Sequence, residues 1–294
     1  MAVDELSNFL MKVDTNIELS SVILSDENKE KVRIFLNEVE NRDKLMEYGL
    51  YPMNRLLFYG ASGTGKTFLA KALSNRLKYT MLYIDIAKAL ADNSVAQNMA
   101  AIFSIAEQKK NCIIFLDECD SITMSRYNMD YGDTAQVRRA TNSLFQQLDQ
   151  MSPFNIFIAA TNLLFKIDPA FERRMNMKLE FRRPELDIKD AIKKFIFPKF
   201  EIIDDVDSTT ENIVARRAGQ YAKLSYYEIQ GLVERAMKKA VLSGTNKIRT
   251  SEVYKDLAVA MRVKLRFNNA DPGRGGLQQN ADDPEEIFHN DQPT

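Results

Sequence analysis

The residues with the clearest chemical signature are the eight in GASGTGKT, at positions 60–67. Their spacing is G-x-x-x-x-G-K-T, and they follow an apolar run and precede a helix-like segment. Glycines in such a turn let backbone N–H groups surround phosphate oxygens, and the next helix adds the positive end of its dipole. Lys66 is expected to reach the β- and γ-phosphates, and the Thr67 hydroxyl to bind Mg²⁺. The predicted nucleotide-binding residues are Gly60, Ala61, Ser62, Gly63, Thr64, Gly65, Lys66, Thr67 and Phe68.

A pair of adjacent carboxylates, Asp117 and Glu118, ends the apolar run CIIFLDE. Two carboxylates at the end of a buried strand are costly unless a cation or a reaction uses them. Asp117 is expected to hold Mg²⁺ through its water shell, and Glu118 to activate the attacking water as a general base. Asp120 is more typical of a helix N-cap than of a ligand. The Asp-Glu pair, together with the absence of a guanine-binding N-K-x-D motif, favours an ATPase over a GTPase-like switch.

Three further candidates follow the fourth strand-like run. Asn162 ends IAATN, where the end of a parallel strand borders the crevice that binds ligands, so its amide could orient the attacking water or sense the γ-phosphate. Arg173 and Arg174 follow in the same motif region. They are either surface arginines on a short helix or arginine fingers that reach the γ-phosphate of a neighbouring subunit. A finger contributes roughly 10³–10⁵ in rate, against about 1 kcal/mol or less for an exposed ion pair.

Five apolar or β-branched runs alternate with helix-like segments through the first 181 residues. This alternation predicts an α/β fold with a five-stranded, mostly parallel P-loop sheet and helices on both faces. The nearly continuous apolar character of the middle runs agrees with strands buried on both sides. The predicted strands lie at 54–60, 79–86, 112–118, 155–161 and 177–181.

The remainder of the chain has helical apolar spacing only, which predicts a small all-α domain. We expect a short N-terminal extension (1–20), the α/β nucleotide-binding domain (21–184), the helical domain (185–267) and a disordered acidic tail (268–294). Apolar residues between positions 3 and 17 of the extension lie on roughly one helical face. They predict a helix that either packs on the body of the protein or docks a partner.

Composition narrows the classes of function. Lys and Arg number 40 and Asp and Glu 41, so the net charge of −1 gives no global electrostatic reason to bind nucleic acid or an anionic membrane. Cys112, Cys119 and the single His289 cannot assemble a zinc site, and we expect reduced, buried thiols. The sequence has no secretory signal and no stretch of about 18 apolar residues, so we expect a cytoplasmic protein without a membrane partner.

In this order and at these spacings, GASGTGKT, IIFLDE, IAATN and IDPAFERRMNMKLEFRRP resemble the motifs of an AAA-type ATPase of the AAA+ superfamily. The segment that precedes them is similar to the entry segment of bacterial single-module members. The resemblance covers about residues 22–264. It implies ATP and Mg²⁺ as cofactors, a helical lid after the α/β domain, and a homo-oligomeric ring, usually hexameric, with ATP between subunits. It also implies that Asn162 is sensor 1 and that Arg173 and Arg174 act in trans.

One departure from the family pattern concerns the pore. Protein-threading members carry an aromatic residue, a small apolar residue and Gly where this chain has Ala91, Asp92 and Asn93. Tyr127 and Tyr131, in a later loop, either line the pore instead or are ordinary loop tyrosines.

Three functions therefore remain open. The first is a ring that remodels a partner protein at the expense of ATP. The second is an ATP-gated ring that regulates or scaffolds a separate effector enzyme without threading. The third and weakest is a nucleic-acid motor or loader, because the sequence has neither excess basic charge nor an aromatic-basic platform.

Overall fold

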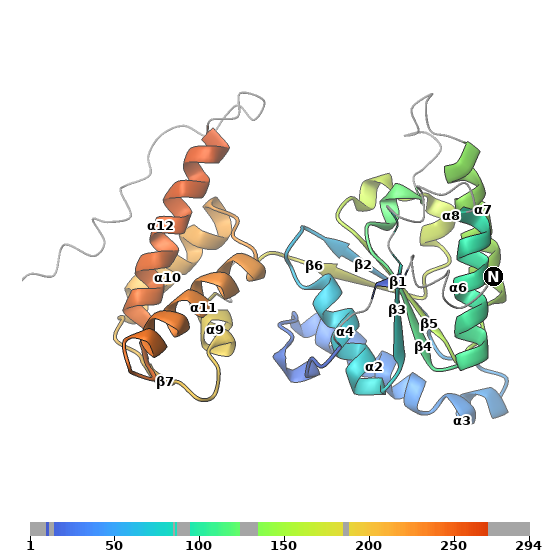
Figure 1. The fold of residues 1–294 in the computed structure, drawn as a ribbon, viewed down its shortest axis with the longest axis horizontal. Coiled ribbons are helices and arrows are strands. Elements are labelled where there is room, and N and C mark those ends of the chain that lie inside the picture. Colours follow the sequence, from blue (N-terminus) through green and yellow to red (C-terminus); the bar gives the residue numbers. More distant parts are fainter. Residues whose placement is uncertain are drawn as a thin grey trace, which may run out of the picture. The chain divides into compact units, whose positions relative to one another are not determined.

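Figure 1 shows the computed structural model, which describes residues 10–11, 15–84, 86, 95–123, 135–184 and 188–269. The chain divides into two compact units, Met1–Phe181 and Arg182–Thr294. None of the helices in the described ranges has the length and apolar character that a membrane crossing requires.

The first unit is built on a six-stranded sheet with the strand order β1-β3-β4-β5-β2-β6. The last five of these strands run parallel, which confirms the predicted five-stranded parallel sheet, and β1 is antiparallel to β3. Every residue of β4 and β5 is buried, as expected for strands covered on both faces. The strands are β1 (Leu10–Met11), β2 (Arg55–Gly60), β3 (Thr80–Ile84), β4 (Cys112–Leu116), β5 (Ile156–Thr161) and β6 (Met177–Phe181).

Helices lie on both faces of this sheet (Figure 1). Because side chains alternate between the two faces along a strand, Phe115 packs in the apolar cluster that contains α4, whereas Leu116 packs in the one that contains α6 and α7. The α-helices of the unit are α2 (Asp26–Glu40), α3 (Arg42–Glu47), α4 (Lys66–Leu77), α6 (Val95–Lys109), α7 (Ala135–Gln150) and α8 (Pro169–Glu172). Short 3-10 helices are η1 (Leu19–Ser21), η2 (Cys119–Ser121) and η4 (Leu164–Lys166).

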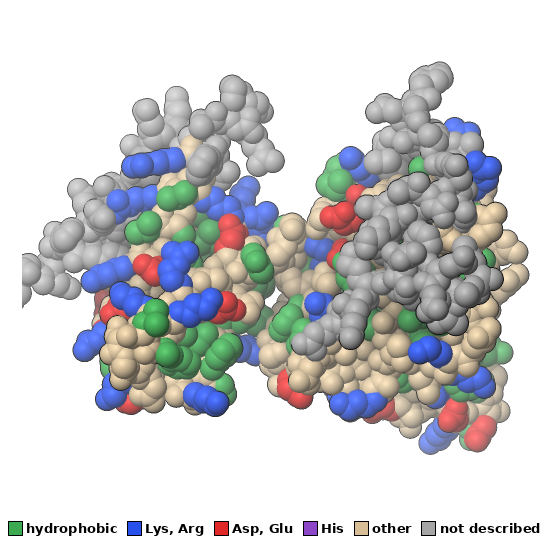
Figure 2. All heavy atoms as spheres, viewed as in Figure 1, with side chains coloured by type: hydrophobic (Ala, Val, Ile, Leu, Met, Phe, Trp, Pro, Cys, Tyr) green, Lys and Arg blue, Asp and Glu red, His purple; other side chains and the backbone are tan. Residues whose placement is uncertain are grey.

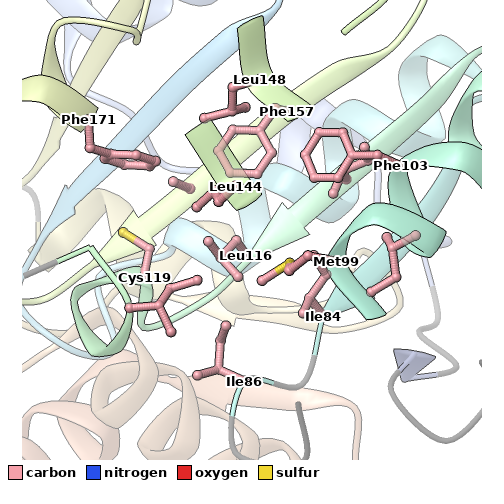
Figure 3. Close-up of a cluster of buried hydrophobic side chains, with 14 of the residues drawn as sticks. Ile84, Ile86, Met99, Phe103, Leu116, Cys119, Leu144, Leu148, Phe157 and Phe171 are labelled. Atoms are coloured by element: carbon pink, nitrogen blue, oxygen red, sulfur yellow. The ribbon is translucent and has the colours of Figure 1, made fainter. Parts of the chain in front are cut away.

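Aromatic contacts connect α8 to the sheet. Phe157 of β5 stacks on Phe103 of α6 with a centroid distance of 6.1 Å, and meets Phe171 of α8 edge-on at 6.3 Å. Phe171 also stacks on Phe145 of α7 at 6.2 Å. Figure 3 shows this cluster, with Leu144 and Leu148 of α7 beside the rings of Phe157 and Phe171. The short α8 is therefore held in place by the core rather than by its own hydrogen bonds.

Both cysteines are buried free thiols, as expected. Burial raises the pKa of Cys112 and of Cys119. A thiol with a raised pKa carries little thiolate at neutral pH and reacts slowly. The two cysteines thus contribute to packing in the sheet region.

The prediction of a helix in the N-terminal extension is wrong at Leu10 and Met11. These two residues form β1, which pairs with Ile84 and Tyr83 of β3. The free edge of β3 offers unpaired backbone groups, and an extended segment satisfies them. Ile17 and Leu19 pack against the apolar cluster on the α4 face, while most of the expected helical face lies outside the described residues.

The second unit is mainly helical, with α9 (Ile188–Phe195), α10 (Ser208–Arg216), α11 (Tyr226–Leu242) and α12 (Thr250–Asn269). A π-helical turn, η5 (Arg217–Tyr221), follows α10. The sequence prediction missed one feature, a parallel pair of three-residue strands, β7 (Glu201–Ile203) and β8 (Lys247–Arg249). Strands this short leave too little alternation to be recognised in a sequence. Helix α12 extends two residues beyond the expected end of the domain at 267.

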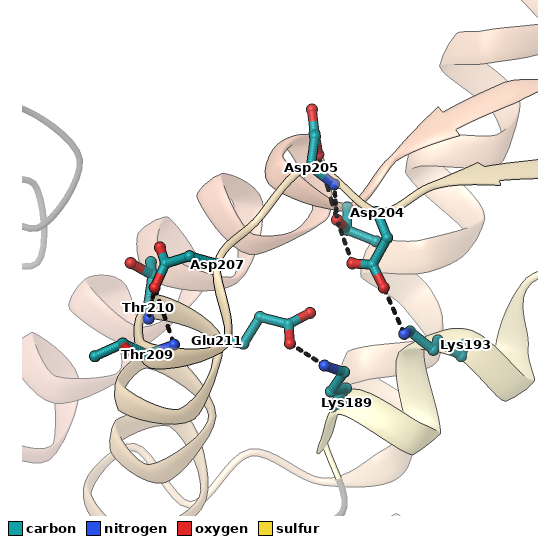
Figure 4. A network of polar contacts seen from close by, with 9 residues as sticks. Lys189, Lys193, Asp204, Asp205, Asp207, Thr209, Thr210 and Glu211 are labelled. Atoms are coloured by element: carbon teal, nitrogen blue, oxygen red, sulfur yellow. Dashed lines mark hydrogen bonds and ion pairs between the residues drawn. The ribbon is translucent and has the colours of Figure 1, made fainter. Parts of the chain in front are cut away.

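Polar contacts fix the helices of this unit around the loop before α10 (Figure 4). Lys193 of α9 donates to Asp204 at 2.7 Å, and Lys189 of the same helix pairs with Glu211 of α10. Asp207 caps α10 by accepting from two backbone N–H groups of its first turn, at 2.9 Å each. Glu211 is only 2% exposed, so its pairing with Lys189 offsets the cost of a buried carboxylate.

Candidate functional site

The predicted phosphate loop connects β2 to α4 and needs its glycines. Gly60, Gly63 and Gly65 have φ angles of +142°, +72° and +105°, a region that other residues rarely adopt. Gly60 is required for a second reason, because a Cβ there would lie 2.0 Å from the carbonyl oxygen of Phe181 in β6. The Thr64 hydroxyl donates to the Ala61 carbonyl at 2.7 Å and closes the loop on itself.

Lys66 is the first residue of α4 and is only 6% exposed. Its Nζ donates to the carbonyl oxygens of Gly60 at 2.8 Å and Ala61 at 2.9 Å, and to Oδ1 of Asn162 at 2.7 Å. Burial lowers the pKa of Lys66, and the charges of Asp117 and Asp120 act in the opposite direction. Phosphate oxygens are stronger acceptors than these neutral groups, so the ammonium group is a ready partner for a nucleotide phosphate.

The other residues of the loop differ in what they can offer. Ser62 and Gly63 are exposed, while Thr64 is 2% exposed. The side chain of Phe68 packs against the apolar cluster on the α4 face, which leaves its backbone N–H in the first turn of the helix. Because the first N–H groups of a helix have no partner within it, Lys66, Thr67 and Phe68 present donors suited to an anion.

Asp117, just after β4, is the point where three segments meet. Its Oδ2 accepts a hydrogen bond from the Thr67 hydroxyl at 2.9 Å and from the Tyr83 hydroxyl at 3.1 Å. Its Oδ1 accepts from the backbone N–H of Glu118 at 2.9 Å. Sequence reasoning predicted the Thr67–Asp117 association but missed Tyr83. No residue pattern points to this tyrosine, because its place beside β4 depends on the strand register.

The oxygen donors at this point fit a hard divalent cation. Mg²⁺ in nucleotide sites takes one or two protein oxygens and completes its shell with phosphates and water. Thr67 and Asp117 supply a hydroxyl and a carboxylate of that kind. Among the described residues no group of three or more His, Cys, Asp or Glu side chains could hold a metal by itself.

Glu118 and Asn162 are both exposed at the carboxyl edge of the sheet. Glu118 has a φ of +49°, a left-handed conformation that is costly for a non-glycine residue and is concentrated at functional sites. The sequence predicts that Asp120 caps a helix, and this prediction is wrong. Asp120 lies within η2, and its carboxylate accepts a hydrogen bond from the Thr161 hydroxyl at 2.6 Å. This contact ties the segment after β4 to the end of β5, directly beside Asn162.

The two arginines have different surroundings. Arg173 is exposed, and its Nε donates to the Pro169 carbonyl of its own helix at 3.2 Å. Arg174 pairs with Asp149 of α7 through two hydrogen bonds of 2.9 Å each, which raise the pKa of Arg174 and lower that of Asp149. Within the described residues, neither arginine hydrogen-bonds a residue of the phosphate loop or the Asp117–Glu118 pair. The structure thus brings Lys66 to Asn162 and Thr67 to Asp117, with Glu118 next to Asp117 in the chain.

Some sequence predictions fall on parts of the chain that the structure does not describe. The pore segment with Ala91, Asp92 and Asn93 lies outside the described residues. Tyr127 and Tyr131 do as well, together with the tail from residue 270 onward.

The carboxyl edge of the parallel sheet carries a glycine-rich loop, a lysine at the start of the helix that follows it, and a hydrogen-bonded Thr–Asp pair. These features define a P-loop nucleotide-binding domain. Residues 56–183 match the family described as "ATPase family associated with various cellular activities (AAA)". Residues 56–183 thus form an AAA-type ATPase domain of the AAA+ superfamily.

Similar proteins agree with this assignment. The chain is 25% identical over 253 residues to "Uncharacterized AAA family ATPase y4kL" of Sinorhizobium fredii, which covers 85% of this chain and 73% of that protein. It is 34% identical over 192 residues to "26S proteasome regulatory subunit 4 homolog" of Saccharomyces cerevisiae, covering 63% of this chain and 43% of the relative. It is 32% identical over 207 residues to "26S proteasome regulatory subunit 6B homolog" of Encephalitozoon cuniculi, covering 68% and 51%. The chain thus spans about half or less of these two proteasomal relatives.

Proposed function

We propose that this chain forms a homo-oligomeric ring, with six subunits as the expected number. In this ring it hydrolyses Mg²⁺–ATP between neighbouring subunits and uses the energy to remodel a partner protein. The observation that carries the proposal is the convergence at the phosphate loop, where Lys66 Nζ lies 2.7 Å from Asn162 Oδ1 and Thr67 Oγ1 lies 2.9 Å from Asp117 Oδ2. Likeness to proteins named as proteasome regulatory subunits supports the remodelling of protein partners.

Each residue of the site has a role that follows from its position. Lys66 and the first N–H groups of α4 bind the nucleotide phosphates, and Thr67 and Asp117 hold Mg²⁺. When bound, Mg²⁺ neutralises charge on the phosphates. Glu118, exposed just after Asp117, takes the proton of the attacking water, and the Asn162 amide orients that water.

The sequence predicts that both arginines act as arginine fingers, but their contacts suggest different roles. Arg173 is exposed, and within the described ranges its side chain hydrogen-bonds only its own helix, so it can reach the γ-phosphate of a neighbouring subunit. Arg174 is held by Asp149 and lies with its guanidinium 4.5 Å from the centre of the Phe145 ring. We therefore assign the principal trans contact to Arg173, and to Arg174 the positioning of α8 that presents it.

A second function is favoured by one feature of the sequence. The segment with Ala91, Asp92 and Asn93 offers no aromatic side chain to grip a polypeptide. This composition favours an ATP-gated ring that regulates or scaffolds a separate effector enzyme.

Charge argues against the nucleic-acid alternative. The net charge is −1, and Figure 2 shows acidic side chains among the basic ones on both units. Nucleic-acid motors depend on a strongly basic surface along the phosphate backbone.

The experiment that tests the proposal uses Glu118→Gln, with Glu47→Gln as the matched control. Glu47 is an exposed residue of α3. Loss of a general base slows the chemical step by about 10²–10⁴-fold without preventing ATP binding. We expect Glu118→Gln to bind ATP and to accumulate as a ring measurable by light scattering, while Glu47→Gln turns over normally. Normal hydrolysis by Glu118→Gln, or a monomer at saturating ATP, would contradict the proposal.

The same trapped ring separates the two functions. Proteins that co-purify with Glu118→Gln can be identified by mass spectrometry, with the wild-type chain as the reference. A heterogeneous set of unfolded or tagged proteins supports remodelling. A single folded enzyme in fixed stoichiometry supports the gated ring.

A further inference from the structure

One hydroxyl at the site has no role in the account above. Tyr83 of β3 donates to Oδ2 of Asp117 at 3.1 Å, beside the bond of 2.9 Å from the Thr67 hydroxyl to the same oxygen. The other oxygen, Oδ1, accepts from the backbone N–H of Glu118 at 2.9 Å. Donors from three segments of the chain therefore hold a single carboxylate.

The strand register explains why a tyrosine of β3 reaches this place. Tyr83 lies opposite Phe115 in the parallel ladder between β3 and β4, so the two side chains lie on one face of the sheet. Their ring centroids are 5.2 Å apart. Asp117 is two residues beyond Phe115, and alternation gives it the same face. Since Tyr83 and Phe115 both pack in the cluster on the α4 face, the first turn of α4 brings Thr67 to the same point.

A carboxylate has about four lone-pair sites, and these three donors occupy three of them. Within the part of the chain that the structure describes, Oδ1 accepts only the Glu118 N–H, so the site that remains is on this oxygen. The Thr67 hydroxyl is itself expected to engage the metal, so its hold on Asp117 depends on how that ligand is oriented.

We propose that Tyr83 is a positioning residue of the magnesium site, whose hydroxyl fixes the Asp117 carboxylate so that one lone pair of Oδ1 stays available to the water shell of the ion. This inference rests on the proposed function, because it needs Asp117 to serve Mg²⁺. Groups that orient a metal ligand in this way change metal affinity by about 10–100-fold when they are removed.

The test uses the full chain and compares Tyr83→Phe with Tyr79→Phe. Tyr83→Phe keeps the aromatic side chain and its contact with Phe115 but removes the hydroxyl. Tyr79 lies just before β3, and its hydroxyl accepts from Arg42 instead, so Tyr79→Phe removes a bonded hydroxyl away from Asp117. Affinity for a fluorescent ADP is measured in EDTA and over a Mg²⁺ titration, together with the unfolding temperature.

We expect Tyr83→Phe to bind the fluorescent ADP normally in EDTA and to need about 10–100-fold more Mg²⁺ for half of the magnesium-dependent gain in affinity. Tyr79→Phe should keep the wild-type Mg²⁺ midpoint. A wild-type midpoint in Tyr83→Phe overturns the role of Tyr83 and leaves the proposed function intact. An equal shift in Tyr79→Phe also overturns it, since the effect would then be general. Failure of the wild-type chain to bind the nucleotide at any Mg²⁺ concentration would instead overturn the proposed function.

Discussion

Arg174 and Asp149 form a two-pronged ion pair between the end of α8 and α7, with Nε–Oδ1 and Nη2–Oδ2 distances of 2.9 Å. The same guanidinium donates to the Ala170 carbonyl at 2.9 Å. Arg173, its neighbour in the sequence, is exposed, and among the described residues its side chain donates only to the Pro169 carbonyl. Two arginines that look equivalent in the sequence thus have different partners, and this difference can be measured.

Arg174→Ala should lower the free energy of unfolding of the first unit, whereas Arg173→Ala should leave it nearly unchanged. The Asp149 side chain is 51% exposed, so the ion pair contributes only about 0.5–1 kcal/mol after solvent screening. The contact with the Phe145 ring adds about 0.5–1 kcal/mol. Chemical denaturation of both variants would measure the difference. Equal stability of the two variants would contradict the assignment of Arg174 to a role within its own subunit.

The pair also predicts a pH dependence. The hydrogen bond from Arg174 lowers the pKa of Asp149 in the folded chain, so its stabilisation is complete above the unfolded pKa of about 3.9 and is lost as the pH falls through the lower, folded value. The gap in unfolding temperature between wild type and Asp149→Asn should therefore be constant from neutral pH down to about pH 5 and close at more acidic pH. A gap that persists at pH 2 would show that the lost charge is not its cause.

Mixed rings test whether Arg173 acts in trans. Arg173→Ala and Lys66→Ala should each be nearly inactive alone, the first by about 10³–10⁵-fold. In an equal mixture, a site with an intact Lys66 borders an intact Arg173 at about a quarter of the interfaces, because neighbours in a ring contact head to tail. Steady-state ATPase assays should then recover up to that fraction of wild-type activity. No recovery, in rings shown by labelling to mix, would mean that the finger acts within its own chain.

The main features of the site could be predicted from the sequence because they depend on topology. Parallel strands end at one edge of the sheet, so the loop at 60–67, Asp117 and Asn162 were expected to lie close together. Lys66 and Asn162 do meet at 2.7 Å. The segments with strand-like or helix-like apolar spacing in this region are long enough for their periodicity to be recognised.

Features that depend on register or on short segments could not be predicted. Tyr83 reaches Asp117 only because it is paired with Phe115, and the sequence does not give that pairing. Asp149 lies far along the chain from Arg174, on a helix whose orientation is set by the core. The residues of the two-residue strand β1 are also consistent with a helical pattern. They form a strand because the free edge of β3 offers backbone groups with which to pair.

Lys66→Ala should abolish nucleotide binding, because it removes the buried cation beside the loop carbonyls and Asn162. Lys71→Ala, on the same helix, is the matched control and should bind normally. Isothermal titration with ATP in Mg²⁺ measures both variants, and circular dichroism verifies that they are folded. Wild-type affinity in a folded Lys66→Ala variant would be incompatible with nucleotide binding at this loop.

Gly60→Ala should destabilise the first unit strongly, whereas Gly231→Ala should not. At Gly60 a methyl group meets the Phe181 carbonyl oxygen at 2.0 Å and the φ of +142° disfavours any side chain, so backbone strain and overpacking together cost about 2–6 kcal/mol. Gly231 lies within α11 with no atom within 4 Å of its added Cβ, and alanine there should stabilise the helix by about 0.5–1 kcal/mol. If β2 and β6 pack as closely as observed, denaturant unfolding should show a lower free energy of unfolding for Gly60→Ala and a higher one for Gly231→Ala. A Gly60→Ala chain as stable as wild type would require that β6 lies farther from the loop, and with it the register that aligns the carboxyl edge of the sheet would be wrong.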